Sequence, residues 1–213
     1  MQINDLDHVV VVAGSREAGS AWVEAALGAR PEMGGEHARM GTHNALLRLG
    51  DRQYLEVIAI DPQAPGPDRP RWFGMDRLTH DSPPRLAAWV ARTPDLAQAA
   101  AASILPLGEI ESMKRGALSW QIAVPIDGEL LLEGALPTLI QWTGDHPAAG
   151  LPDRGCRLLG LELFNPWPLA LAALLQSIGL RHAVTIRTLP HDERPFLRAT
   201  IETPIGLRVL GGP

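Results

Sequence analysis

The hydrophobic positions fall into short β-branched runs and longer amphipathic stretches that follow one another in a regular order. Residues 6–13 (LDHVVVVA) form a nearly continuous apolar run, which is typical of a strand buried on both faces. Apolar side chains then recur at helical spacing over residues 15–27, with Ser15 as a candidate N-cap. Residues 42–49 and 53–60 predict two antiparallel strands joined by a short reversal.

Glycines between the predicted helix and these strands favour a turn. Gly34 and Gly35 are adjacent and predict a reversal of the chain. The pattern leaves open whether a further short strand precedes Gly41. The first sixty residues therefore predict a strand, a helix, and then two or three antiparallel strands.

The same order of elements returns twice. In a second unit, strands are predicted at residues 86–92, 110–113, 118–124 and 137–142, with a helix at 94–104 that Thr93 and Pro94 open. After a polar linker at residues 144–155, a third unit predicts strands at 157–164, 184–188, 196–203 and 206–210, with a helix at 166–178 opened by Asn165 and Pro166. This recurrence is an internal architectural repeat and predicts an α+β protein.

A long loop, residues 61–85, interrupts the pattern and carries six prolines. Structureless loops of this length are uncommon in compact domains and are often functional covers or disordered links. The adjacent aromatics Trp72 and Phe73 disfavour disorder. We therefore expect the loop to pack against the rest of the protein.

Composition excludes several classes of function. The 213 residues carry a net charge of −5, and Lys114 is the only lysine, which argues against a nucleic-acid-binding surface. The single cysteine, Cys156, excludes an internal disulfide and favours a reducing compartment. No apolar run approaches the roughly 20 residues of a membrane span, and the N-terminus lacks the features of a signal peptide. We expect a cytoplasmic globular protein whose partner is a small molecule.

Several short motifs in the first third of the chain match a known family. They are Asp7-His8, Gly35-Glu36-His37, Gly41-Thr42-His43-Asn44, Tyr54-Leu55-Glu56 and Pro70-Arg71-Trp72-Phe73. With these motifs the chain resembles glyoxalase-like domains of the vicinal-oxygen-chelate superfamily, which includes glyoxalase, bleomycin-resistance and dihydroxybiphenyl dioxygenase proteins. The resemblance implies an α+β fold in which repeated βαβββ modules form curved, mainly antiparallel sheets around a cavity.

The resemblance also implies a domain organisation. Residues 1–143 would form a glyoxalase-like domain of two modules, 1–60 and 86–143, joined by the proline-rich loop 61–85. Residues 156–213 would form a third βαβββ-like module. Because module pairing in this superfamily often crosses chains, a homodimer is expected.

His8 and Glu56 are the candidate metal ligands, since the resemblance places them in the first and last strands of the first module. An imidazole nitrogen and a carboxylate oxygen suit Zn, Mn, Fe or Ni. Both side chains stand in apolar runs, where an unpaired polar group costs roughly 1–3 kcal/mol. A shared metal would give each of them a partner, and so would a direct His8–Glu56 hydrogen bond. Further candidate oxygen ligands in the later units are Gln141 and Glu162, with Gln121 and Glu133 as weaker options.

Other polar and aromatic residues are expected around this pair. His43, together with Glu56, is a candidate acid or base, or alternatively a ligand or substrate contact. Expected substrate contacts are His37, Asn44, Arg71, Trp72 and Phe73. The histidines could instead fix the glycine-rich loop 34–41, and the aromatics could simply anchor the proline-rich loop. Cys156 is expected to be structural, and His80, His146, His182 and His191 to lie in loops without partners.

Two functions follow as hypotheses. The first is a divalent-metal-dependent lyase or isomerase, or a dioxygenase-like enzyme, acting on a small oxygen-bearing substrate. The second is a metal-free protein of the same fold that binds or sequesters a small molecule without catalysis. The metal content of the purified protein discriminates between them.

Overall fold

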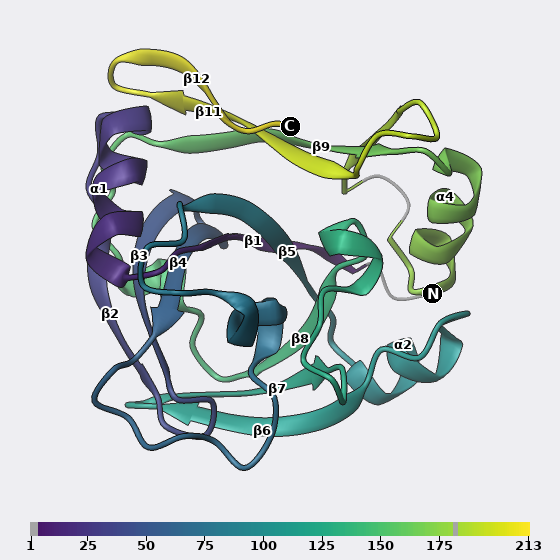
Figure 1. Cartoon of the computed structure of the whole chain (residues 1–213), viewed down its shortest axis with the longest axis horizontal. Coiled ribbons are helices and arrows are strands. Elements are labelled where there is room, and N and C mark those ends of the chain that lie inside the picture. The colour runs from purple at the N-terminus through teal and green to yellow at the C-terminus, as the bar shows by residue number, and fades with distance from the viewer. Residues whose placement is uncertain (1–3, 181–182) are drawn as a thin grey trace.

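The protein, described by a computed structural model over residues 4–180 and 183–213, contains two β-sheets with helices packed beside them (Figure 1). His182 lies outside the described residues. The larger sheet contains β1 (Asp5–Val12), β2 (Glu32–His37), β3 (Thr42–Gly50), β4 (Gln53–Ile60), β5 (Arg85–Arg92), β6 (Glu109–Arg115), β7 (Leu118–Val124) and β8 (Thr138–Thr143). The smaller sheet contains β9 (Arg157–Asn165), β10 (Thr185–Thr188), β11 (Phe196–Thr203) and β12 (Gly206–Gly211). The helical elements are α1 (Arg16–Leu27), α2 (Leu96–Ala102), α3 (Pro147–Gly150) and α4 (Pro168–Ser177), with 3-10 turns η1 (Trp72–Arg77) and η2 (Leu131–Gly134).

The larger sheet consists of two modules with the same internal topology. Its strand order is β2-β3-β4-β1-β5-β8-β7-β6, and in each module the first and last strands are parallel neighbours. The antiparallel pairing of β1 with β5 joins the two modules. The sheet curls until its edge strands, β2 and β6, contact one another. The predicted α+β fold with curved, mainly antiparallel sheets is confirmed.

The third unit has the predicted order of elements but not the strand order of the first two. Its order is β10-β9-β11-β12, so its first strand pairs with its second and third strands rather than with its last. Its side chains share one hydrophobic cluster with the outer face of the larger sheet, and Cys156 is buried in that cluster. The third unit therefore packs against its own chain, and the homodimer stays a prediction.

The predicted helices are present, with shifted starts. Ser15 caps α1 as expected, since its hydroxyl accepts a hydrogen bond from the Ala18 amide at 3.2 Å. In α2 the cap is Asp95 rather than Thr93, because its carboxylate accepts from the Gln98 amide at 2.9 Å. α4 begins at Pro168, two residues later than predicted, and α3 lies inside the segment predicted to be a linker.

Gly34 and Gly35 do not form the predicted turn but lie within β2, which settles the open question of a further strand. Both positions are crowded. A Cβ atom added at Gly34 would lie 2.0 Å from the Asn44 side-chain oxygen, and one at Gly35 would lie 2.7 Å from Cδ of Arg115. The glycines therefore let neighbouring side chains cross the strand at close range.

Side chains of the larger sheet divide between two hydrophobic clusters because alternate residues of a strand face opposite sides. In β1, Val9 and Val11 contribute to the cluster shared with the helices and the smaller sheet. Val10 and Val12 contribute to a second cluster inside the curl, together with Trp72 and Phe73 from η1. The proline-rich loop thus packs down on the curled sheet, as predicted.

Candidate functional site

A register shift in β1 brings two neighbouring polar residues to the same side of the sheet. In the pairing with β5, Leu6 lies opposite Ala91 and His8 lies opposite Val90, so Asp7 is an extra residue on β1. Such a bulge interrupts the alternation of side chains and is common near functional sites. As a result, Asp7 and His8 both contribute to the polar network inside the curl.

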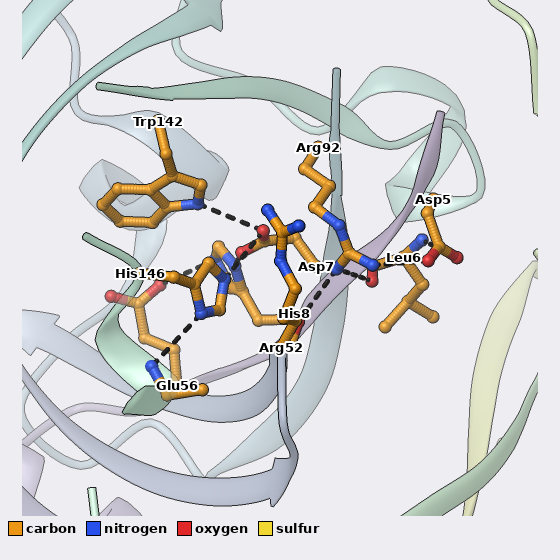
Figure 2. Close-up of polar contacts among 10 residues, drawn as sticks. Asp5, Leu6, Asp7, His8, Arg52, Glu56, Arg92, Trp142 and His146 are labelled. Atoms are coloured by element: carbon orange, nitrogen blue, oxygen red, sulfur yellow. Dashed lines mark hydrogen bonds and ion pairs between the residues drawn. The ribbon is translucent and has the colours of Figure 1, made fainter. Parts of the chain in front are cut away.

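Asp7 is fully buried and accepts three hydrogen bonds from side chains. Its Oδ1 accepts from His8 Nδ1 at 2.7 Å, and its Oδ2 accepts from His146 Nε2 at 3.0 Å and Trp142 Nε1 at 3.1 Å. Figure 2 shows the Trp142 and His146 rings directed at this carboxylate. Burial opposes ionisation of Asp7, but the hydrogen bonds from His146 and His8 outweigh it and hold its pKa well below the usual range.

His8 stands between two carboxylates. Its Nδ1 is held by Asp7, and its Nε2 lies 3.5 Å from Oε2 of Glu56. Burial disfavours the imidazolium, yet Asp7 and Glu56 together raise the pKa of His8. For Glu56, burial is opposed by His8 and by Asn44, which lower its pKa to about 2. The expected convergence of His8 and Glu56 is therefore present, as a buried ion pair.

Asn44 positions Glu56 from the neighbouring strand. Its Nδ2 donates to Glu56 Oε1 at 2.5 Å, while its Oδ1 accepts from the Gly35 amide at 3.0 Å. Both Asn44 and Glu56 are buried. Glu56 Oε2 is left facing His8, so one edge of the carboxylate is fixed and the other remains available to the pocket.

His37 is neutral and has a defined tautomer. Arg115 can only donate, so its contact with His37 Nε2 at 3.0 Å makes that nitrogen an acceptor. His37 Nδ1–H then donates to the Thr42 hydroxyl at 3.0 Å. Burial lowers the pKa of His37 to about 4, and the positive charge of Arg115 acts in the same direction.

These polar groups form one end of a small pocket. His8, His37, Tyr54, Glu56 and Arg115 line its polar part. Within it, about 20 Å³ is open to the centre of a water molecule, which is room for a few atoms at most. The ring of Tyr54 stacks on His8 with centroids 4.3 Å apart, and burial keeps the pKa of this phenol well above its usual range.

The remaining walls are carbon-rich. They are Trp72, Phe73, Trp120, Ile122, Ile140 and Trp142. Phe73 adopts a left-handed backbone conformation (φ 59°), which costs a non-glycine residue about 1–2 kcal/mol. The indole N–H of Trp72 is buried without any acceptor among the described residues, and such orphaned donors usually mark an unseen partner.

Two of the predicted site residues lie elsewhere. His43 is on the opposite face of β3 from Asn44, near Asp61 and the start of α1, where burial and the charge of Arg16 lower its pKa. The prediction that His43 lines the cavity with His8 and Glu56 is therefore wrong. Arg71 pairs with Asp76 at 2.6 Å and is not among the pocket residues, so it braces the loop instead of covering the pocket.

Several residues of the site escaped the sequence analysis. His146 was expected to lack a partner, but it is buried against Asp7. Arg115, Trp120 and Trp142 belong to the second module and were not singled out. The signal that could have found Arg115 is weak: it stands directly after Lys114, two residues beyond the end of the strand predicted at residues 110–113.

The donor set fits a divalent metal poorly. His8 and Glu56 are the two predicted ligands at the pocket, and the nearby His37 directs its Nε2 at Arg115. The second module presents Arg115 and carbon side chains there, including Ile122 and Ile140, and none of these is a metal ligand. Gln141 accepts from the Leu96 amide at 2.7 Å, and Glu162 pairs with Arg187 in the smaller sheet. In the described part of the chain, no three His, Cys, Asp or Glu side chains are grouped to hold a metal ion. Two protein ligands fall short of the three or four of known catalytic zinc sites.

Comparison with known proteins identifies a family. The model of the family described as "Glyoxalase-like domain" matches residues 6–179, most of the chain. No curated protein matches the chain in sequence. No helix in the described part of the chain is long and apolar enough to cross a membrane.

Solved structures share the fold at low sequence identity. A hypothetical protein from Staphylococcus aureus has a TM-score of 0.57 at 11% identity, covering 98% of this chain and 85% of that one. A mutant of 4-hydroxymandelate synthase from Streptomyces coelicolor has a TM-score of 0.50 at 15% identity, covering 99% of this chain and 63% of that one. Methylmalonyl-CoA epimerase from Mycobacterium tuberculosis has a TM-score of 0.43 at 14% identity, covering 69% and 92%. At these identities the likeness to the first two structures establishes a common fold alone.

Proposed function

Since the chain belongs to the glyoxalase-like domain family, of the vicinal-oxygen-chelate superfamily that its sequence resembles, we propose that it binds a small oxygen-bearing molecule in this pocket without a resident divalent metal. The observation that carries the proposal is that the polar groups of this end already contact one another. His8 is already held by Asp7 and Glu56, and the opposite wall offers carbon. The pair can therefore stay buried and charged without a metal.

The ligand would be recognised from two sides. His8 presents an N–H group and Glu56 a carboxylate oxygen to the polar end of the pocket. The aromatic walls bury the carbon part of the ligand, as most small-molecule sites do. A single polar end opposite an apolar wall favours a compact organic molecule with one oxygen-bearing group.

The experiment is metal analysis of untagged protein together with ligand binding. We expect far less than one metal per chain in the wild type, in His8→Ala and in Glu56→Gln, and no loss of folding on treatment with a chelator. His80→Ala, at an exposed histidine, is the matched control. Indole resonances of the pocket tryptophans should shift when small oxygen-bearing compounds are added, and His8→Ala should weaken that binding.

One observation favours the metal-dependent lyase or isomerase as a second candidate. Asp7 holds Nδ1 of His8, and carboxylates commonly orient metal-binding histidines in this way. About one equivalent of metal in the wild type and in His80→Ala, absent from both His8→Ala and Glu56→Gln, would support this candidate and overturn the metal-free proposal.

A further inference from the structure

We propose that the ligand of this pocket is a carboxylate and that Arg115 is the residue that binds its two oxygens. The inference rests on the proposed function and specifies its substrate class. It is carried by the excess of hydrogen-bond donors around the pocket and by the placement of the Arg115 side chain.

The pocket presents more donors than acceptors. The indole N–H of Trp72 has no acceptor, and the Arg115 guanidinium has five N–H groups but only His37 Nε2 as a described acceptor. Tyr54 also lines the pocket, and its hydroxyl can either donate or accept. On the acceptor side, Glu56 is engaged by Asn44 and faces His8. A ligand that satisfies this site must bring acceptors.

Arg115 is placed across the pocket by the packing of two edge strands. It ends β6, and its side chain lies over Gly35 of β2, where a Cβ atom would be 2.7 Å from its Cδ and 3.0 Å from its Cγ. Its guanidinium carbon lies 5.9 Å from the Trp120 ring centroid. Gly35 therefore provides the space that lets Arg115 reach His37 and the pocket.

No carboxylate neutralises Arg115 among the residues that the structure describes. Neighbouring arginines differ in this respect, since Arg69 and Arg39 both pair with Glu111. Lys114 lines an adjoining cavity of about 180 Å³ that shares His37 and Trp120 with the pocket. Arg115 and Lys114 therefore place positive charge on this side of the site, whereas Asp7 and Glu56 both contact His8.

The shape of the site favours a planar carboxylate over a phosphate. A guanidinium can fork onto a carboxylate or onto a phosphate, so the choice between them rests on size, because a planar carboxylate is smaller than a tetrahedral phosphate. The free space around the polar end suits a group of a few atoms. The stacked and edge-on aromatic walls then accept the carbon part of the acid.

The test compares acids with their neutral amides by NMR titration of the tryptophan indole resonances. The probes are formate against formamide, acetate against acetamide, and inorganic phosphate. In the wild type, the acids should bind more tightly than the amides and than phosphate. Arg115→Gln should weaken acid binding roughly 10- to 100-fold, as expected for loss of charge-assisted hydrogen bonds, and leave amide binding unchanged. Arg115→Lys should retain part of the affinity for the acids. Arg30→Gln, at an exposed arginine, is the control and should bind the acids as tightly as the wild type.

A second variant leaves Arg115 itself intact. Gly35→Ala should displace the Arg115 side chain and reduce the preference for acids, whereas Gly66→Ala, at an open loop position, should not. Equal binding of acid and amide, tighter binding of phosphate, or wild-type acid affinity in Arg115→Gln would overturn the carboxylate assignment while the proposed function stands. If none of the probes shifts the pocket indoles, both are overturned.

Discussion

The buried carboxylate of Asp7 should contribute more to stability than any other single polar side chain of β1. In Asp7→Asn, the new amide can accept from one side only, so its NH2 group faces either His8 or the pair His146 and Trp142. Breaking a buried, hydrogen-bonded charge typically costs 3–5 kcal/mol. We expect the free energy of unfolding to fall by about 3 kcal/mol, which for a protein of this size lowers Tm by roughly 6–12 °C.

The matched control is Asp5→Asn on the same strand. Asp5 pairs with Arg92 but is about half exposed, and such surface ion pairs contribute about 0–1 kcal/mol. Denaturant unfolding at pH 7 gives the free energies of unfolding for both variants. If Asp7→Asn is destabilised no more than Asp5→Asn, the hydrogen-bond network of Figure 2 does not hold the strand as described.

The same variant has a pH signature. The pKa of Asp7 is depressed in the folded state, so its contribution is present above its unfolded pKa near 4 and is lost as pH falls below that value. The difference between wild type and Asp7→Asn should therefore shrink below about pH 4. NMR titration should also show that the raised pKa of His8 moves back toward its ordinary value in the variant, because Asp7 is a main cause of the rise. An unchanged His8 pKa would contradict the assigned role of Asp7.

Three further outcomes follow from the site. Because the pKa of His37 is lowered to about 4, its neutral form stabilises the fold above pH 6.5. As pH falls from 6.5 to about 4, the free energy of unfolding should decrease by up to about 3 kcal/mol. NMR titration and denaturant unfolding at each pH check this, and a His37 pKa near 6.5 would contradict it. Asn44→Asp places a second carboxylate against Glu56 and should destabilise the protein by about 2–4 kcal/mol at pH 7, less at pH 4, as measured by denaturant unfolding; equal loss at both pH values would argue against charge repulsion. Gly34→Ala should lower Tm by several degrees relative to Gly66→Ala, because its Cβ would collide with the Asn44 side chain. Equal Tm values would show that β2 shifts to accommodate the added methyl group.

The elements of the fold could be predicted because their signals are local. The run at residues 6–13, the Ser15 cap and the repeated strand–helix starts each depend on a few neighbouring residues. The position of β2 could not be predicted in the same way, since Gly34 and Gly35 are ordinary turn residues in sequence. Asn44 lies beside Gly34 through the pairing of β2 with β3, whereas Arg115 reaches Gly35 only where the edge strands β2 and β6 meet.

The candidate site was only partly predictable for a similar reason. His8 and Glu56 stand in apolar runs, so a polar partner for each was a sound expectation, and the structure brings them within 3.5 Å. His146 and Arg115 lie far along the chain and meet the first module only through the pairing of β1 with β5 and the contact of β2 with β6. No local pattern carries that information.

Two single-residue register shifts decide which polar side chains reach the pocket. In the β3–β4 pair, Gly50 lies opposite Gln53 but Arg48 lies opposite Tyr54, so Leu49 is an extra residue. Without that shift, Glu56 would lie opposite Leu47 and share a face with His43, because one residue of slippage reverses the facing of a strand. With it, Glu56 lies opposite Leu46 and shares its face with Asn44. The corresponding shift at Asp7 places an acid beside His8. The chemistry of the pocket therefore depends on backbone irregularities that hydrophobic periodicity cannot reveal. Because the shift places Asn44 rather than His43 on the face of Glu56, Glu56 has an amide donor beside it instead of a second imidazole.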